Sequence, residues 1–312
     1  MAIIKLISDF DGVWTNQDIE AEYVRNYIIK RISELTTFPE KEIKDLLVDC
    51  KRDMDKTPFD YGWKYEGHTA CYYQEDPFGD NNAIFDYIEK YSSRASYSNY
   101  KQKLAVIKDS ILKKTKNKTL LDFSNECFVK STTQFKLEGK LKPVRSAETI
   151  VKELNKKGTE IIVASNSKTE KIEHLFRKAG HKVTNEKSIV RGRLHAIGNA
   201  QKFVIDKLFT EVPEKLEINK RYQPELRRKY YFNILLEEKP DYVIGDVFSL
   251  DLSLPFYLRL NDNRFKKLKV ILLMHKHTPK WVKEYLNREE FSEITYMIDN
   301  IEELPNLIIN SK

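Results

Sequence analysis

The apolar residues of this chain form short, nearly continuous runs near the N-terminus and in the second half. The clearest runs occupy residues 3–7, 160–164, 241–245, 269–274 and 294–298. Runs of this length that are rich in β-branched residues predict buried strands. Helical patterns lie between the later runs, for example from Ser146 to Lys157, where Gly158 marks a helix end. Strands that alternate with helices predict an α/β fold with a Rossmann-like parallel sheet.

The segment from residue 16 to about residue 138 has a different pattern, which predicts helices throughout. Thr37-Phe38-Pro39-Glu40 is a capping-box pattern. The apolar residues that follow it keep a helical spacing: Ile43, Leu46, Leu47 and Cys50. Further helices are predicted over residues 83–91, 98–114 and 120–135. We therefore expect an α-helical domain, residues 16–138, inserted into an α/β core made of residues 1–15 and 139–312.

Three of the predicted core strands end in polar side chains. The residues at these ends are Asp9 and Asp11, Ser165 and Asn166, and Asp246 with Asp251 close behind. Gly12 lets the backbone turn away after the first pair. Because ligands of parallel α/β sheets bind at the carboxyl ends of the strands, we expect these residues to form one site.

Acids gathered at such an edge suit phosphoryl transfer. A carboxylate can attack the negatively charged phosphoryl group only if a cation neutralises both. Mg²⁺ prefers about six oxygen ligands and keeps several waters, so two carboxylates and a carbonyl from the protein suffice. Asp9, Asp246 and the backbone carbonyl of Asp11 are the predicted metal ligands, with Asp251 as a further acid beside them.

The motif set of this chain is DxDGV, then VASN, then a Lys or Arg, then GDxxxxD. In this order it resembles the haloacid dehalogenase superfamily, whose commonest members are magnesium-dependent phosphatases. The resemblance covers about residues 2–15 and 140–300. The helical insertion after the first motif looks like the cap domain of that family, which closes over the site and excludes water.

The resemblance also implies a role for each motif residue. Asp9 would be the nucleophile that forms an aspartyl-phosphate, and Asp11 would protonate the leaving oxygen before activating water. Ser165, Asn166 and the cation of the third motif would hold the transferring oxygens, and Asp251 would position a metal-bound water or that cation. Ser167-Lys168-Thr169-Glu170 is a second capping-box pattern, which predicts a helix that begins beside the site and points its N-terminal amides toward phosphate.

The cation of the third motif has three candidates. Lys202 follows a Gly-Asn turn and could open a helix that faces the site. Arg221 begins Arg221-Tyr222-Gln223-Pro224, which mimics the Lys-Pro-x-Pro of the family, and it precedes Asp246 by 246 − 221 = 25 residues. Arg228 is the third candidate. We favour Lys202 over the two arginines.

The composition of the chain excludes several classes of function. The chain has 54 Lys and Arg against 47 Asp and Glu, a formal charge of +7, which suits an anionic substrate but falls short of a nucleic-acid signature. Its three cysteines lack CxxC spacing, and His275-Lys276-His277 has no third zinc ligand nearby in sequence. No apolar run approaches the ~18 residues of a membrane span, and no signal-peptide pattern is present. We expect a cytoplasmic protein without a membrane partner.

Together these features predict a Mg²⁺-dependent hydrolase of a small soluble phosphomonoester. Asp11 argues against a dehalogenase, because a halide leaves without a proton. A phosphomutase or a phosphonate hydrolase would keep much of the same motif set. A binding or regulatory module with this fold is disfavoured, because it would have no reason to retain all the acids. The sequence specifies neither the substrate and its pathway nor the oligomeric state.

Overall fold

The structure is a computed structural model that describes residues 3–181, 183–184 and 194–310. It divides into two units, one made of Met1–Asn16 and Lys142–Lys312 and the other of Gln17–Leu141. We refer to the first as the core unit and to the second as the inserted unit.

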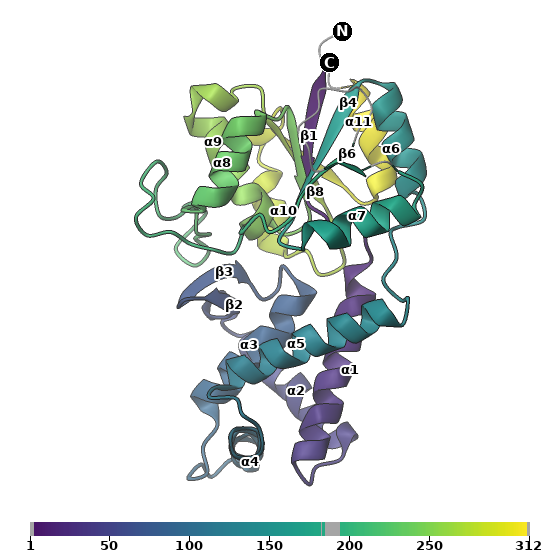
Figure 1. Cartoon of the computed structure of the whole chain (residues 1–312). Helices are drawn as coiled ribbons and strands as arrows, with labels where there is room; N and C mark the ends of the chain where they lie inside the picture. The colour runs from purple at the N-terminus through teal and green to yellow at the C-terminus, as the bar shows by residue number, and fades with distance from the viewer. Residues whose placement is uncertain (1–2, 182, 185–193, 311–312) are drawn as a thin grey trace. The chain divides into compact units, whose positions relative to one another are not determined.

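The core unit is built on a seven-stranded sheet in the order β5-β6-β4-β1-β7-β8-β9 (Figure 1). Every neighbouring pair is parallel. The strands are β1 (Ile4–Ser8), β4 (Thr159–Ala164), β5 (Val183–Thr184), β6 (Leu194–Ile197), β7 (Tyr242–Gly245), β8 (Lys269–Leu273) and β9 (Thr295–Ile298). The predicted α/β fold with a parallel sheet is confirmed.

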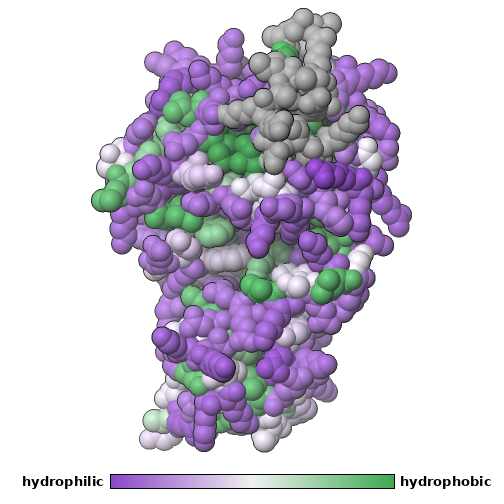
Figure 2. Space-filling view, in the orientation of Figure 1, coloured by the Kyte–Doolittle hydropathy of each residue, from purple (hydrophilic) through white to green (hydrophobic). Residues whose placement is uncertain are grey.

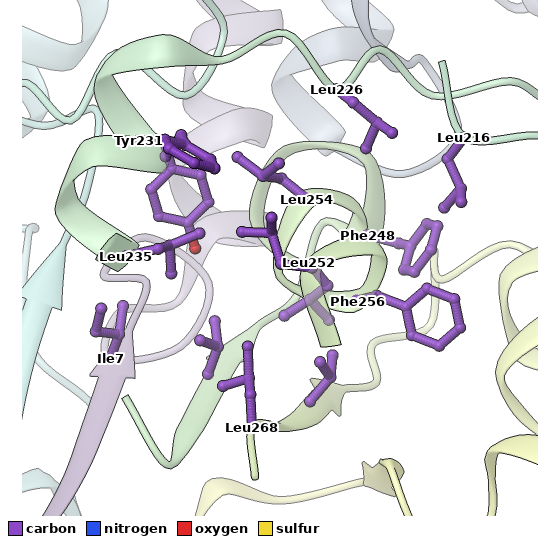
Figure 3. Packing of buried hydrophobic residues seen from close by; sticks show 14 of the residues in the cluster. Ile7, Leu216, Leu226, Tyr231, Leu235, Phe248, Leu252, Leu254, Phe256 and Leu268 are labelled. Carbon is purple, nitrogen blue, oxygen red and sulfur yellow. The ribbon is translucent and has the colours of Figure 1, made fainter. Parts of the chain in front are cut away.

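Helices cover both faces of this sheet, with α6 and α11 on one side and α8 and α9 on the other (Figure 1). The helices of the core unit are α6 (Ala147–Lys156), α7 (Thr169–Lys178), α8 (Lys229–Glu238), α9 (Ser253–Asn261), α10 (Lys280–Leu286) and α11 (Leu304–Asn310). Figure 3 shows the apolar core on the α8 and α9 side, where the Tyr231 ring lies among Leu235, Leu252 and Leu254.

The register of the central strands brings their carboxyl ends level with one another. Ser8, the last residue of β1, pairs with Val163 of β4 and with Ile244 of β7. One residue later, the amide of Asp9 donates to the carbonyl oxygen of Ile244 at 2.9 Å. The polar residues that follow these three strands therefore leave the sheet at the same edge.

The inserted unit is mainly helical, with its own apolar core. Its helices are α1 (Gln17–Leu35), α2 (Glu40–Met54), α3 (Pro77–Tyr91), α4 (Asn99–Lys114) and α5 (Leu120–Leu137). The expectation of helices throughout is wrong at one place, where β2 (Gly62–Tyr65) and β3 (His68–Tyr72) form an antiparallel hairpin. Glu66 and Gly67 both have positive φ, 46° and 84°, which is the backbone shape that a two-residue hairpin turn requires.

The start of α2 also differs from the prediction. Pro39 occupies the N-cap position, and no side chain caps this end. The Thr36 hydroxyl, and not a capping box from Thr37, accepts a hydrogen bond from the amide of Phe38 at 3.2 Å. Proline at the N-cap accounts for the missing cap, because its side chain has no oxygen that could accept a hydrogen bond from the first amides of the helix.

Among the helices of the described residues, none has both the length and the apolar character needed to cross a membrane. On the face shown in Figure 2, hydrophilic residues predominate and hydrophobic ones occur in scattered groups.

Candidate functional site

The centre of the site is a buried lysine between two buried carboxylates. Lys202 Nζ lies 2.7 Å from Asp9 Oδ1 and 2.8 Å from Asp251 Oδ1. Asp9 follows β1, while Asp251 lies in a short π-helix, Phe248–Leu252, that follows β7 and leads into α9. All three side chains are buried, with Lys202 only 1% exposed. The ammonium ion therefore joins residues that are far apart in the sequence.

Lys202 does not open a helix as expected, because residues 198–228, all of them described, contain no helix. It lies in a turn instead, where Asn199 and Gln201 have φ values of 52° and 50°. The turn is tied to the end of β4: the Ala200 amide donates to the Ser165 carbonyl at 2.8 Å. Asn166 Oδ1 accepts a hydrogen bond from the Lys202 amide at 2.7 Å. Asn166 thus holds the backbone that carries the lysine.

Tyr231 of α8 completes the surroundings of this lysine. Lys202 Nζ lies 5.2 Å from the centre of the Tyr231 ring, a cation–π distance. The Tyr231 hydroxyl donates to the carbonyl oxygen of Asp251 at 2.9 Å. Burial raises the pKa of Tyr231, so the hydroxyl keeps its proton and stays a donor.

Asp246, the acid directly after β7, joins Asp9 and Asp251 in a group of three buried acids. Ligand atoms from these three carboxylates lie within 4.8 Å of one another, close enough to hold one metal ion. Their oxygens are hard ligands, which suit Mg²⁺. Three of the four acids predicted to be near the metal are therefore brought together. The side chain of the fourth, Asp11, has other partners.

Two glycines make room for these acids. A Cβ atom on Gly12 would lie 2.1 Å from Asp246 Oδ2, and one on Gly245 would lie 2.3 Å from the Cβ of Asp251. Gly12 also has φ +81°, which side chains rarely tolerate. The space that a side chain would fill is occupied by a carboxylate at each position.

The pKa of Asp9 reflects this crowding. Burial raises its pKa from the ordinary 3.8 to about 8, and the neighbouring charges of Asp251 and Asp11 add to the rise while Lys202 opposes it. For Lys202, burial would lower the pKa, but Asp251 and Asp9 together outweigh burial and raise it. Burial is therefore the main cause of the rise at Asp9, whereas at Lys202 the two neighbouring carboxylates prevail over burial.

The carboxylate of Asp11 is held by the segment that leads into α7. Ser167 Oγ donates to Asp11 Oδ2 at 2.5 Å, and Lys171 Nζ lies 2.8 Å from Asp11 Oδ1. Lys171 Nζ also lies 3.1 Å from Ser167 Oγ. The predicted capping box at Ser167 is therefore wrong: α7 begins at Thr169, its N-cap Lys168 makes no side-chain cap, and the serine hydroxyl faces Asp11 instead.

Sequence reasoning missed Ser167 and Lys171 as site residues. One signal was available: Lys171 lies two residues after the start of α7, the helix that follows the motif residue Ser165. Ser165 itself is buried, and its Oγ accepts a hydrogen bond from the Ser167 amide at 3.1 Å. The end of β4 thus contributes to both the Lys202 turn and the Asp11 contacts.

His275, just after β8, also reaches the site. Its Nε2 lies 3.0 Å from the carbonyl oxygen of Gly12 and 3.7 Å from Asp246 Oδ2. His275 was not among the site residues predicted from the sequence, because a histidine just after a strand is typical of a half-exposed strand end. His277 stacks on it, with ring centres 5.2 Å apart.

The two arginine candidates for the third motif have different surroundings. Arg221 is exposed, and its amide donates to Asn219 Oδ1 in a turn. Arg228 is fully buried and donates to main-chain carbonyls, among them that of Lys202. The charged group of the third candidate, Lys202, contacts the Asp9 and Asp251 carboxylates.

No family model and no curated protein matches this chain. Similar solved structures include a 2-haloacid dehalogenase from Pseudomonas syringae, 13% identical over all of both chains with a TM-score of 0.38. CbbY from Rhodobacter sphaeroides, solved with phosphate, is 13% identical over 97% of this chain and 96% of its own, with a TM-score of 0.41. A β-phosphoglucomutase from a hyperthermophilic Pyrococcus is 16% identical over 99% and 100%, with a TM-score of 0.42. At these scores the likeness says nothing about activity.

The raised pKa of Asp9 predicts how pH affects the metal-free protein. The carboxyl group is neutral in the folded protein up to about pH 8, whereas it ionises near 3.8 when unfolded, so its contribution to stability is lost as pH rises between these values. Asn at this position does not ionise. We expect the Tm of Asp9→Asn, measured in EDTA, to exceed that of the wild type by a margin that grows from pH 5 to pH 8.

The matched control is Asp299→Asn, which changes an exposed acid of the same unit. Its Tm should follow that of the wild type at each pH. A margin for Asp9→Asn that stays constant with pH would contradict the assignment of a raised pKa.

Gly12→Ala should destabilise the protein more than a positive φ alone explains. Gly158 provides the control, because it has the same φ of +81° but no heavy atom within 4 Å of the position of a Cβ. A residue strained in this region costs about 1–3 kcal/mol. We expect Gly158→Ala to show only that loss in chemical denaturation, and Gly12→Ala to show a clearly larger one. Equal losses would mean that the Asp246 carboxylate moves aside freely.

Proposed function

We propose that this protein is a Mg²⁺-dependent phosphomonoester hydrolase of the haloacid dehalogenase superfamily, acting on a small phosphorylated metabolite. One observation carries the proposal: a buried ammonium bridges Asp9 and Asp251 at the edge where Asp246 also lies, and Asp11 is held two residues from Asp9. A nucleophilic carboxylate, a fixed cation, a group of metal-binding acids and a second acid are the parts that phosphoryl transfer needs.

In this proposal Asp9 attacks phosphorus and forms an aspartyl-phosphate. Lys202 compensates the negative charge of Asp9 and of the peripheral phosphoryl oxygens, since its ammonium already contacts that carboxylate. Ser165 and Asn166 belong to the same edge, with Asn166 fixing the Lys202 backbone. A Mg²⁺ ion held by Asp9 and Asp246, with Asp251 alongside, would supply positive charge that lets an anionic nucleophile approach an anionic substrate.

Asp11 is the proposed acid and base of the reaction. It would give a proton to the leaving oxygen and later take one from the water that hydrolyses the aspartyl-phosphate. Ser167 and Lys171 hold one carboxylate oxygen each, which fixes the direction in which the carboxyl group faces. A dehalogenase would not need this acid.

Replacing the proposed nucleophile should stop turnover. Asp9→Asn keeps the shape of the side chain but removes the nucleophilic charge, so we expect kcat for phosphate release to fall by at least about a thousand-fold. A screen of phosphorylated metabolites with the wild type identifies the substrate to use. Asp109→Asn, which alters an acid of the inserted unit that is 48% exposed, should leave kcat within a few-fold. Near-normal turnover by folded Asp9→Asn would rule out Asp9 as the nucleophile.

Activity should depend on a divalent metal. EDTA should abolish phosphate release, excess Mg²⁺ should restore it, and Ca²⁺ should restore it poorly, because its looser coordination fits in-line transfer less well. Isothermal titration calorimetry measures the affinity for Mg²⁺ without turnover, and Asp246→Asn should weaken that affinity. Undiminished phosphate release after exhaustive chelation would contradict the metal site.

A further inference from the structure

Arg228 is a fully buried arginine whose guanidinium binds main-chain carbonyl groups. Nη2 donates to the Ser249 carbonyl oxygen at 3.0 Å, and Nε donates to that of Glu225 at 3.2 Å. Nη1 donates to the carbonyl oxygen of Lys202. One side chain therefore links three backbone segments that are separate in the sequence.

Two of these segments carry groups of the candidate active site. The carbonyl of Lys202 belongs to the residue whose ammonium contacts Asp9 and Asp251. Ser249 lies in the same π-helix as Asp251, two residues before it. Because the guanidinium fork has a rigid planar shape, its bonds set the distance between the two segments. The backbone at Lys202 is thus fixed relative to the π-helix that carries Asp251.

Stability alone gives a weak reason for a cation at this position. Removing a guanidinium from water is unfavourable, and hydrogen bonds to carbonyls offset that cost only in part. Arg228 is also the N-cap residue of α8, where the helix dipole disfavours a positive charge. The hydrogen bonds of Arg228 are better explained by the two backbone segments that they hold together, at Lys202 and Ser249.

We propose that Arg228 is a positioning residue that keeps the Lys202 ammonium in contact with Asp9 and Asp251. The effect of Arg228 on the position of the lysine does not depend on what the protein catalyses. Its effect on catalysis rests on the proposed function. The guanidinium would act through the backbone of residues 202 and 249, whose carbonyl groups it binds.

The first test compares Arg228→Lys with Arg227→Met. Lysine keeps the charge but cannot reach three carbonyls, so Lys202 should shift. A displacement on the order of 1 Å can lower the rate by about a hundred-fold, so we expect kcat to fall by about ten- to a hundred-fold with a much smaller change in KM. Arg227 is the matched control, because it donates to the Lys207 carbonyl at 3.2 Å in the same segment. Its variant should keep kcat within about three-fold.

The second test asks whether the effect passes through Lys202. In a double-mutant cycle, Arg228→Lys should lower the residual kcat of Lys202→Met little or not at all, because the group that it positions is absent. Independent losses that multiply in the double variant would overturn the proposal. This outcome separates positioning of Lys202 from a general loss of structure.

The third test does not require turnover. A crystal structure of Arg228→Lys should show Lys202 Nζ moved from its contacts of 2.7 Å with Asp9 and 2.8 Å with Asp251, while the Arg227→Met structure keeps both. Unchanged contacts in Arg228→Lys would overturn the proposal. If the wild type releases no phosphate from any substrate, the proposed function fails, and this structure still decides the role of Arg228.

Arg228→Gln is the second variant if Arg228→Lys does not fold, since its amide can still donate to one or two of the carbonyls. We expect it to fold and to show the same loss of kcat and the same displacement of Lys202. If neither variant folds, Arg228 serves stability and the positioning proposal is wrong.

Discussion

The contact of the Lys202 ammonium with Asp9 and Asp251 is the interaction on which the rest of this edge of the sheet depends. Three carboxylates, Asp246 included, are buried within reach of one metal ion. Buried like charges repel strongly, and each is costly unless it is paired. One ammonium compensates part of this charge, while burial, together with the charges of Asp251 and Asp11, raises the pKa of Asp9. A divalent cation held by these acids, as proposed above, would supply positive charge that one ammonium does not provide.

The surrounding backbone is arranged to keep that contact in place. Gly12 and Gly245 give the carboxylates of Asp246 and Asp251 the volume that side chains would otherwise take. The hydroxyl of Tyr231 and the guanidinium of Arg228 bind carbonyl groups of the same π-helix. Much of the polar bonding around the site therefore fixes main chain, and the charged ends of the side chains follow from it.

The sequence predicts the sheet and its acids well, because both are local patterns. A short apolar run followed by Asp9, or by Asp246, identifies a strand and the residue at its carboxyl end without reference to the rest of the chain. Lys202 was harder to assign from the sequence. Its turn needs a positive φ at Asn199 and Gln201, and neither residue type signals that conformation in the way that glycine does. Spacing made Arg221 a plausible rival, although the structure leaves it exposed.

The remaining site residues could not be read from the sequence because their partners are distant. Ser167 fits a capping box as well as a hydrogen bond to Asp11, which is 156 residues away. His275 meets Gly12 across 263 residues. The hairpin of the inserted unit was missed for a different reason: its aromatic residues suit a helical bundle core as well as a strand, and only the turn at Glu66 and Gly67 distinguishes them.

The strand order has a consequence for how the chain folds during synthesis. β1 is made first, but it lies between β4, which begins at Thr159, and β7, which begins at Tyr242. A nascent chain therefore exposes β1 with both edges unpaired until the whole inserted unit has left the ribosome, and that unit has its own core and can form earlier. Such long-range pairing is slow, and an apolar strand with open edges is prone to aggregation. We expect the N-terminal strand to be the part of the nascent chain that most needs protection by chaperones.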